Sequence, residues 1–186
     1  EDMRKRTRIE QALRKAIAAE EIEAHFQPIV DIRTGAINGF ECLARWTDPE
    51  LGAISPAVFI PLAEQAGFID SLTKSLFLKA IETAKTWPKD TFLSFNLSSV
   101  QLIDPTTSLM LLSILSKADF DPRRIELEIT ETAMMSDPAS AKRIIDEFRA
   151  AGIRISLDDF GTGQSSLGRL REFSFAKVKI DRTFIS

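Results

Sequence analysis

From residue 91 onward, short apolar runs alternate with segments that carry a helical pattern. Four runs are typical of strands: TFLSFNLS (91–98), RIELEIT (124–130), IRISLDD (153–159) and FAKVKID (175–181). Between them the pattern predicts helices near 106–118 and over 139–152, the second closed by Gly152, and a short helix after GTG at 161–163. This order predicts βαβ units and a parallel sheet, which both an open doubly wound sheet and a (β/α) barrel satisfy.

The first 90 residues predict a different arrangement. Ile9, Leu13 and Ile17 recur at helical spacing among charges, so we expect an amphipathic helix, interpreted as a linker (1–24) from an upstream domain. Two strand-like runs at 26–31 and 36–45 flank the turn at 33–35 and predict a hairpin. Two helices follow, one from Ser55-Pro56 and one over 70–87, stopped by Pro88.

Polar residues at or near the ends of five apolar runs favour the barrel. A barrel brings the carboxyl ends of its strands into one ring, where barrel enzymes carry their catalytic groups. The five residues are Glu41, Asn96, Glu128, Asp158 and Lys179. A full barrel takes about 250 residues. With six strand-like runs, we expect this chain to lack the last two strands.

These residue types indicate metal-assisted chemistry on phosphate. Carboxylate and amide oxygens suit Mg²⁺ and Mn²⁺. The adjacent Asp158 and Asp159 could flank two ions about 3.5 to 4 Å apart, the spacing used in phosphoryl displacement. The sequence has one His, His25, and no GxSxG, P-loop or GxGxxG motif, so no other catalytic system competes.

Each candidate also has a purely structural interpretation. Glu41 could form a strand-end salt bridge, and Asn96 could cap the next helix. Asp158 and Asp159 could be turn formers, and Lys179 could extend its charge to a barrel rim. Glu128 and Glu131 could be surface acids on a half-exposed strand. For each residue taken alone, the structural interpretation is at least as good as the functional one. Five such residues at or near strand ends together favour a functional site.

Composition limits the partners and the location. The net charge of −3 gives no positive field for DNA. Cys42 is the single cysteine, which fits a reducing compartment and predicts a cytoplasmic domain. The longest apolar stretch, 108–115, is far shorter than the roughly 20 residues that span a bilayer, so we expect no membrane contact by this segment, although a parent protein could be membrane-anchored.

Seven motifs follow one another between residue 26 and the last residue: FQPIVD, GFECLARW, SPAVFIPLAEQAG, SFNLSS, ELEITET, LDDFGTGQSSLGRL and KIDRTF. In this order they resemble the EAL domains, which hydrolyse cyclic di-GMP to linear pGpG in bacterial signalling. The resemblance implies an EAL domain over 25–186 and a TIM-like (β/α)8 barrel whose first strand is antiparallel. It also implies Mg²⁺ or Mn²⁺ as cofactor, inhibition by Ca²⁺, a homodimer, and an upstream sensory or GGDEF-like domain.

The resemblance also implies roles for individual residues. Glu41, Asn96, Glu128 and Asp158 match ligands of a first metal, and Asp158 with Asp159 matches ligands of a second. Lys179 matches the lysine that holds a water, and Glu131 matches a glutamate that braces the DFGTG loop. The positions that match contacts to the dinucleotide are Gln27, Leu43, Arg45 and Asp181.

Three departures from the family pattern affect these expectations. The signature reads ECL instead of EAL, and Cys42 is close to Ala in bulk, so we expect little effect. Gln164 stands where an aromatic residue is usual, which concerns loop packing and dimerisation. The later AEGVE-like and QGY-like motifs are absent from these residues. The alternative to an enzyme is an inactive receptor that binds cyclic di-GMP without cutting it.

Overall fold

A mostly parallel sheet forms the centre of the molecule. The computed structural model describes residues 2–160 and 173–180. Its sheet runs in the order β1-β2-β4-β5-β6-β7, with β3 paired to β2 beside this path. The β1–β2 pair is antiparallel, and each later pair on the path is parallel. The strands are β1 (Glu23–Val30), β2 (Ile37–Asp48), β3 (Gly52–Ile54), β4 (Phe92–Asn96), β5 (Ile125–Thr130), β6 (Arg154–Phe160) and β7 (Lys177–Ile180).

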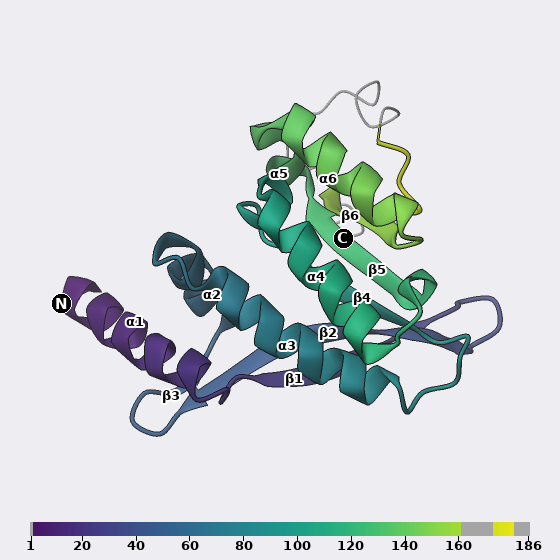
Figure 1. Cartoon of the computed structure of the whole chain (residues 1–186). Helices are drawn as coiled ribbons and strands as arrows, with labels where there is room; N and C mark the ends of the chain where they lie inside the picture. The colour runs from purple at the N-terminus through teal and green to yellow at the C-terminus, as the bar shows by residue number, and fades with distance from the viewer. Residues whose placement is uncertain (1, 161–172, 181–186) are drawn as a thin grey trace.

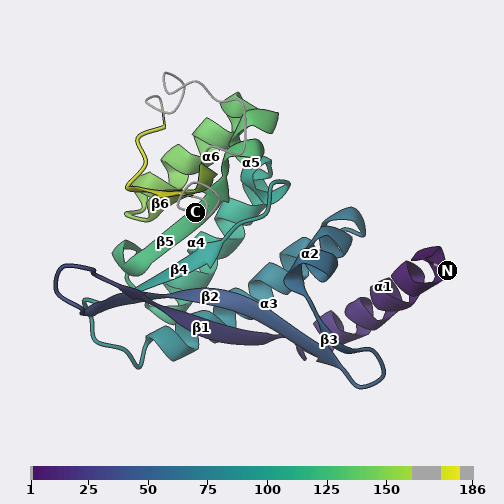
Figure 2. The same ribbon diagram turned by 180° about the vertical axis from the view of Figure 1, so that it is seen from behind.

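Helices cover one face of this sheet. Figure 1 shows α3, α4 and α6 in front of the strands, and the reverse view in Figure 2 presents the sheet with these helices behind it. The helices are α1 (Asp2–Ala18), α2 (Pro56–Gln65), α3 (Ile69–Ala84), α4 (Pro105–Ala118), α5 (Glu131–Ser136) and α6 (Pro138–Ala150), with 3-10 turns η1 (Gln101–Ile103) and η2 (Pro122–Arg124). None of the helices in the described ranges has the length and apolar character needed to cross a bilayer.

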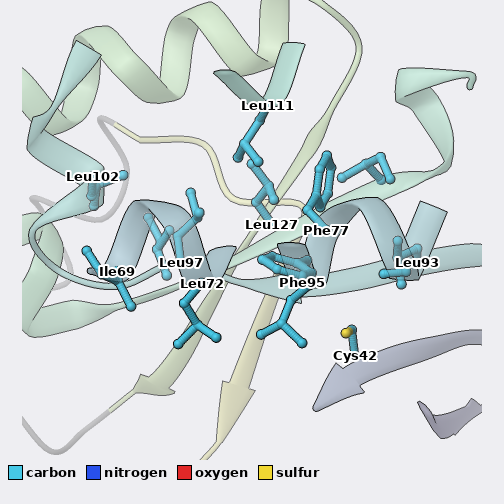
Figure 3. Packing of buried hydrophobic residues seen from close by; sticks show 14 of the residues in the cluster. Cys42, Ile69, Leu72, Phe77, Leu93, Phe95, Leu97, Leu102, Leu111 and Leu127 are labelled. Carbon is cyan, nitrogen blue, oxygen red and sulfur yellow. The ribbon is translucent and has the colours of Figure 1, made fainter. Parts of the chain in front are cut away.

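The core lies between the helices and the strands. Successive strand side chains point to opposite faces, so Leu93 and Phe95 of β4 share the helix-covered face with Leu127 of β5. Phe77 of α3 meets Phe95 edge-on, with ring centroids 5.0 Å apart. Figure 3 shows these side chains packed in one cluster. The intervening residues of the same strands face the other side, which leaves that face free to carry polar groups.

The N-terminal helix packs on this core. Ile9, Leu13 and Ala16 of α1 are buried, and the helix contacts α2 and α3. The guanidinium of Arg14 lies 4.7 Å from the centroid of the Phe68 ring. The predicted amphipathic helix is therefore present, while its interpretation as a linker from another domain stays a prediction.

The fold expected from the sequence is largely confirmed. The sheet is α/β, mostly parallel and antiparallel at its first pair. Four short elements were not predicted, namely β3, α5 and the 3-10 turns η1 and η2. The helix expected to end at Pro88 ends earlier, at Ala84, and a turn leads from it to the proline. The short helix expected after GTG lies outside the described residues.

Candidate active site

The polar face of the sheet brings the candidate residues together. Glu41 lies opposite Ser94 in the β2–β4 register, and Asn96 lies opposite Glu128 in the β4–β5 register. Thr130 of β5 in turn lies opposite Asp158 of β6. These positions therefore lie on neighbouring strands, toward the carboxyl ends of β4, β5 and β6 and beside the middle of β2.

Four of the predicted residues are joined by direct contacts. The Nδ2 of Asn96 donates to Oε1 of Glu41 at 2.9 Å. The Nζ of Lys179 lies 3.2 Å from Oε2 of Glu41 and 2.5 Å from Oε2 of Glu128. One lysine on β7 thus links carboxylates on β2 and β5, two strands that are not neighbours in the sheet. We call Glu41, Asn96, Glu128 and Lys179 the site quartet.

Burial changes the acid–base properties of this quartet. The Glu128 side chain has 0% exposure, against 19% for Glu41 and 26% for Lys179. Burial raises the pKa of Glu128 above its usual value, and the charge of Glu41 adds to this, although hydrogen bonds from Lys179 and Ser94 oppose it. Burial alone would lower the pKa of Lys179, but its bond to Glu128 and the charges of both glutamates raise it overall. Lys179 is therefore a firmly held cation.

Asp158 and Asp159 lie near the quartet at the end of β6. The backbone N–H of Asp159 donates to Oδ1 of Asp158 at 2.9 Å, and Asp159 has a left-handed backbone with φ of 56°. Such a backbone costs energy in a non-glycine residue and turns the chain sharply at the strand end. Both aspartates line a pocket of about 630 Å³ that also includes Asn96.

Some of the other predicted site residues line this pocket and some do not. Leu43 and Arg45 line it, with an apolar wall from α2 and α3 that includes Ile60 and Leu72. Gln27 is exposed on β1 opposite Glu41 and does not line the pocket. Glu131 is buried as the first residue of α5 and does not line it either. Asp181 and Gln164 lie outside the described residues.

Comparison with known proteins decides the family. The family model described as EAL domain matches residues 10–186. This chain belongs to the EAL-domain family.

Relatives of this EAL domain include proteins named for cyclic di-GMP hydrolysis. Probable cyclic di-GMP phosphodiesterase PdeB of Escherichia coli is 38% identical over 93% of this chain and 34% of PdeB. Cyclic di-GMP phosphodiesterase RocR of Pseudomonas aeruginosa is 36% identical over 89% of this chain and 43% of RocR. The chain therefore spans well under half the length of these relatives.

A solved structure of a phosphodiesterase has a closely similar fold. The PaMucR phosphodiesterase in complex with c-di-GMP matches with a TM-score of 0.89 and 34% identity, covering 94% of this chain and 72% of that chain. The barrel-type fold expected from the sequence is thereby confirmed.

The donor atoms of the EAL-domain site fit a hard divalent cation. Glu41, Asn96 and Glu128 supply oxygen donors on three consecutive strands, β2, β4 and β5, and oxygen ligands are those that Mg²⁺ and Mn²⁺ prefer. Within residues 2–160 and 173–180, however, no three His, Cys, Asp or Glu side chains converge as a ready set of ligands. A metal site here needs side chains to rearrange.

Two features of the polar face were not predicted. The hydroxyl of Ser94 donates to Oε1 of Glu128 and is fully buried. In addition, Lys177 Nζ lies 2.8 Å from Oε1 of buried Glu126. This pair lies two residues before Lys179 and Glu128 on the same two strands. The available signal was spacing, because Ser94, Glu126 and Lys177 each precede a site residue by two positions and so share its face.

The buried thiol in the ECL signature is expected to be unreactive. Burial, with the nearby charge of Glu41, raises the pKa of Cys42 to about 12. At pH 8 the reactive thiolate is then about one part in ten thousand of the thiol. We expect Cys42 to react with a disulfide reagent such as Ellman's only over hours in the folded protein, and within seconds in guanidinium chloride. Rapid labelling of the folded protein would contradict this placement.

Proposed function

We propose that this EAL domain is a metal-dependent phosphodiesterase that hydrolyses cyclic di-GMP to linear pGpG. The observation that carries the proposal is the site quartet, in which a buried and a half-buried carboxylate converge beside an open pocket. The names of PdeB and RocR, and the c-di-GMP complex of PaMucR, support the same substrate.

The proposed metal ligands are the residues that match the ligands of the EAL family. Glu41, Asn96, Glu128 and Asp158 would hold one Mg²⁺ or Mn²⁺, and Asp158 with Asp159 would hold a second. When bound, such ions supply Lewis acidity and neutralise charge on the phosphodiester. Ca²⁺ prefers more ligands and longer distances, so it would fit this set poorly and inhibit.

The remaining residues act on the substrate or on neighbouring chain. Lys179 would hold a water and stabilise the negative charge that develops on phosphorus oxygens. Leu43 would contact the dinucleotide from the pocket wall, with Gln27 and Asp181 as further contacts. Glu131 would brace the loop that follows Asp158 and Asp159. A linker helix over 1–24, a homodimer, an upstream domain and a cytoplasmic location all stay predictions.

Arg45 is expected to bind a phosphate of the substrate. Its guanidinium can donate two parallel hydrogen bonds to one phosphate, which a lysine cannot reproduce. We therefore expect Arg45→Lys to raise KM for cyclic di-GMP by about tenfold, the size of one lost charge-assisted bond, with a smaller change in kcat. Steady-state kinetics measure both constants. Arg33→Lys, an exposed arginine of the β1–β2 turn, is the matched control, and an unchanged KM in the Arg45 variant would remove this role.

A turnover assay tests the proposed function. The protein is incubated with cyclic di-GMP and Mg²⁺, Mn²⁺ or Ca²⁺, and the nucleotides are separated by chromatography. We expect pGpG with Mg²⁺ or Mn²⁺ and none with Ca²⁺. Tight binding of cyclic di-GMP without product in any metal would instead support the receptor function.

A further inference from the structure

Lys179 lies where its charge is shared by two proposed metal ligands. Its ammonium is within 3.2 Å of Glu41 and 2.5 Å of Glu128. In the part of the chain that the structure describes, no other Lys or Arg is paired with either carboxylate. A single side chain therefore provides the counter-charge for both acids.

These two acids need a cation for energetic reasons. Glu128 is fully buried, and an ionised carboxylate without a partner is costly to hold in such a place. Glu41 and Glu128 also repel each other, because both carboxylates lie within 3.2 Å of the same ammonium. A cation between them relieves both penalties, whether it is an ammonium or a divalent metal ion.

The orientation of Asn96 is consistent with a competition between these cations. Its amide nitrogen faces Oε1 of Glu41, as a carboxylate acceptor requires. A metal ion held by Glu41 and Asn96 needs the amide oxygen, so the amide group must turn when the ion binds. Glu41 thus has a donor on each of its two oxygens, Nδ2 of Asn96 on one and Nζ of Lys179 on the other.

We propose that the Lys179 ammonium and a divalent cation compete for the carboxylates of Glu41 and Glu128. Lys179 is then the counterion that holds the two acids together when no metal is bound, and metal entry moves Nζ off at least one of them. Released in this way, Nζ becomes available for the water or the phosphate. The inference rests on the metal site of the proposed function, but it concerns cation binding and not hydrolysis.

The chain contains a matched control for this competition. Lys177 lies two residues before Lys179 on β7, and its partner Glu126 lies two residues before Glu128 on β5. This second pair has the same strands and the same chemistry, with Nζ 2.8 Å from Oε1. Glu126 is not a proposed metal ligand, so loss of Lys177 removes an ion pair of the same chemistry without freeing the metal site, although Arg154 Nε remains 4.0 Å from Glu126 Oε2.

The test is calorimetric titration of Mn²⁺ into the protein without nucleotide. We expect Lys179→Gln to bind Mn²⁺ at least about tenfold more tightly than the unchanged protein, because a charge-assisted hydrogen bond no longer competes. Lys177→Gln should leave the affinity within about twofold, since no ligand is freed. Lys179→Arg should bind Mn²⁺ more weakly than the unchanged protein, because the larger fork holds both carboxylates. Circular dichroism checks the fold of each variant.

Opposite results would overturn the competition. Equal or weaker Mn²⁺ binding by Lys179→Gln would mean that the lysine organises the ligands instead of competing with the metal. If Lys179→Gln does not fold, the Lys179→Arg variant decides the question by itself. Mn²⁺ binding by Lys179→Arg that is equal to or tighter than that of the unchanged protein would then overturn the proposal. Absence of Mn²⁺ binding in every variant removes the metal site and this inference with it. Normal Mn²⁺ binding without pGpG formation contradicts only the proposed hydrolysis.

Discussion

Replacing Glu41 by glutamine is expected to lower the rate of cyclic di-GMP hydrolysis by at least about a thousandfold, since a metal ligand and its charge are lost together. Glutamine has nearly the same shape, and its amide oxygen can still accept the hydrogen bond from Asn96. The fold should therefore survive, with a thermal midpoint within about 5 °C of the unchanged protein. The measurements are initial rates of pGpG formation and a thermal denaturation curve.

A glutamate on the neighbouring strand provides the control for this substitution. Glu23→Gln changes an exposed side chain of β1 that is paired only with His25 among the described residues. Its hydrolysis rate should stay within about twofold of the unchanged protein, as is usual for a surface substitution. Substantial activity in Glu41→Gln would exclude Glu41 as a metal ligand, whatever the control shows.

Truncation of Phe77 to alanine is expected to cost about 3 to 5 kcal/mol of unfolding free energy. The Phe77 ring is fully buried and meets the Phe95 ring edge-on at 5.0 Å (Figure 3). Its removal loses the transfer free energy of the ring and leaves a cavity between α3 and β4. Since Phe95 directly precedes Asn96, we expect the site to loosen as well. Guanidinium denaturation measures the free energy.

The next residue of the same helix serves as the reference for Phe77. Leu78 is 39% exposed, so Leu78→Ala removes a side chain that is already partly in water. We expect this variant to lose less than about 1 kcal/mol. A comparable loss for the two variants would contradict the packing of α3 against β4.

The strands could be predicted because both their faces are informative. In β5, Ile125, Leu127 and Ile129 form the buried face that predicts a strand, while Glu128 between them signals the polar side. The same logic predicted β4, β6 and β7 and placed Asn96, Asp158 and Lys179 at one edge. The unpredicted short elements, among them β3 and α5, give weaker signals. In particular, α5 directly follows β5, and its start depends on the hydroxyl of Thr130, which accepts from Ala133 N–H.

The contacts among the site residues could not be predicted. Lys179 reaches across β6 to Glu128 and across the polar face to Glu41, so its partners depend on the registers of several strand pairs. The side chain of Asn96 was weighed as a helix cap, and it donates to Glu41 instead. The motif resemblance identified the residues, but only three-dimensional structure could reveal that a lysine holds the acids together.

The most direct test of the proposed site is to locate manganese in crystals of this EAL domain grown with Mn²⁺ and cyclic di-GMP. Anomalous diffraction marks the metal without reference to any rate. We predict one peak within about 2.3 Å of oxygens from Glu41, Asn96, Glu128 and Asp158, and a second peak beside Asp158 and Asp159, with a phosphodiester of the ligand next to them. Manganese bound elsewhere, or cyclic di-GMP bound with Lys179 still holding both glutamates and no metal between them, would contradict the proposed two-metal phosphodiesterase.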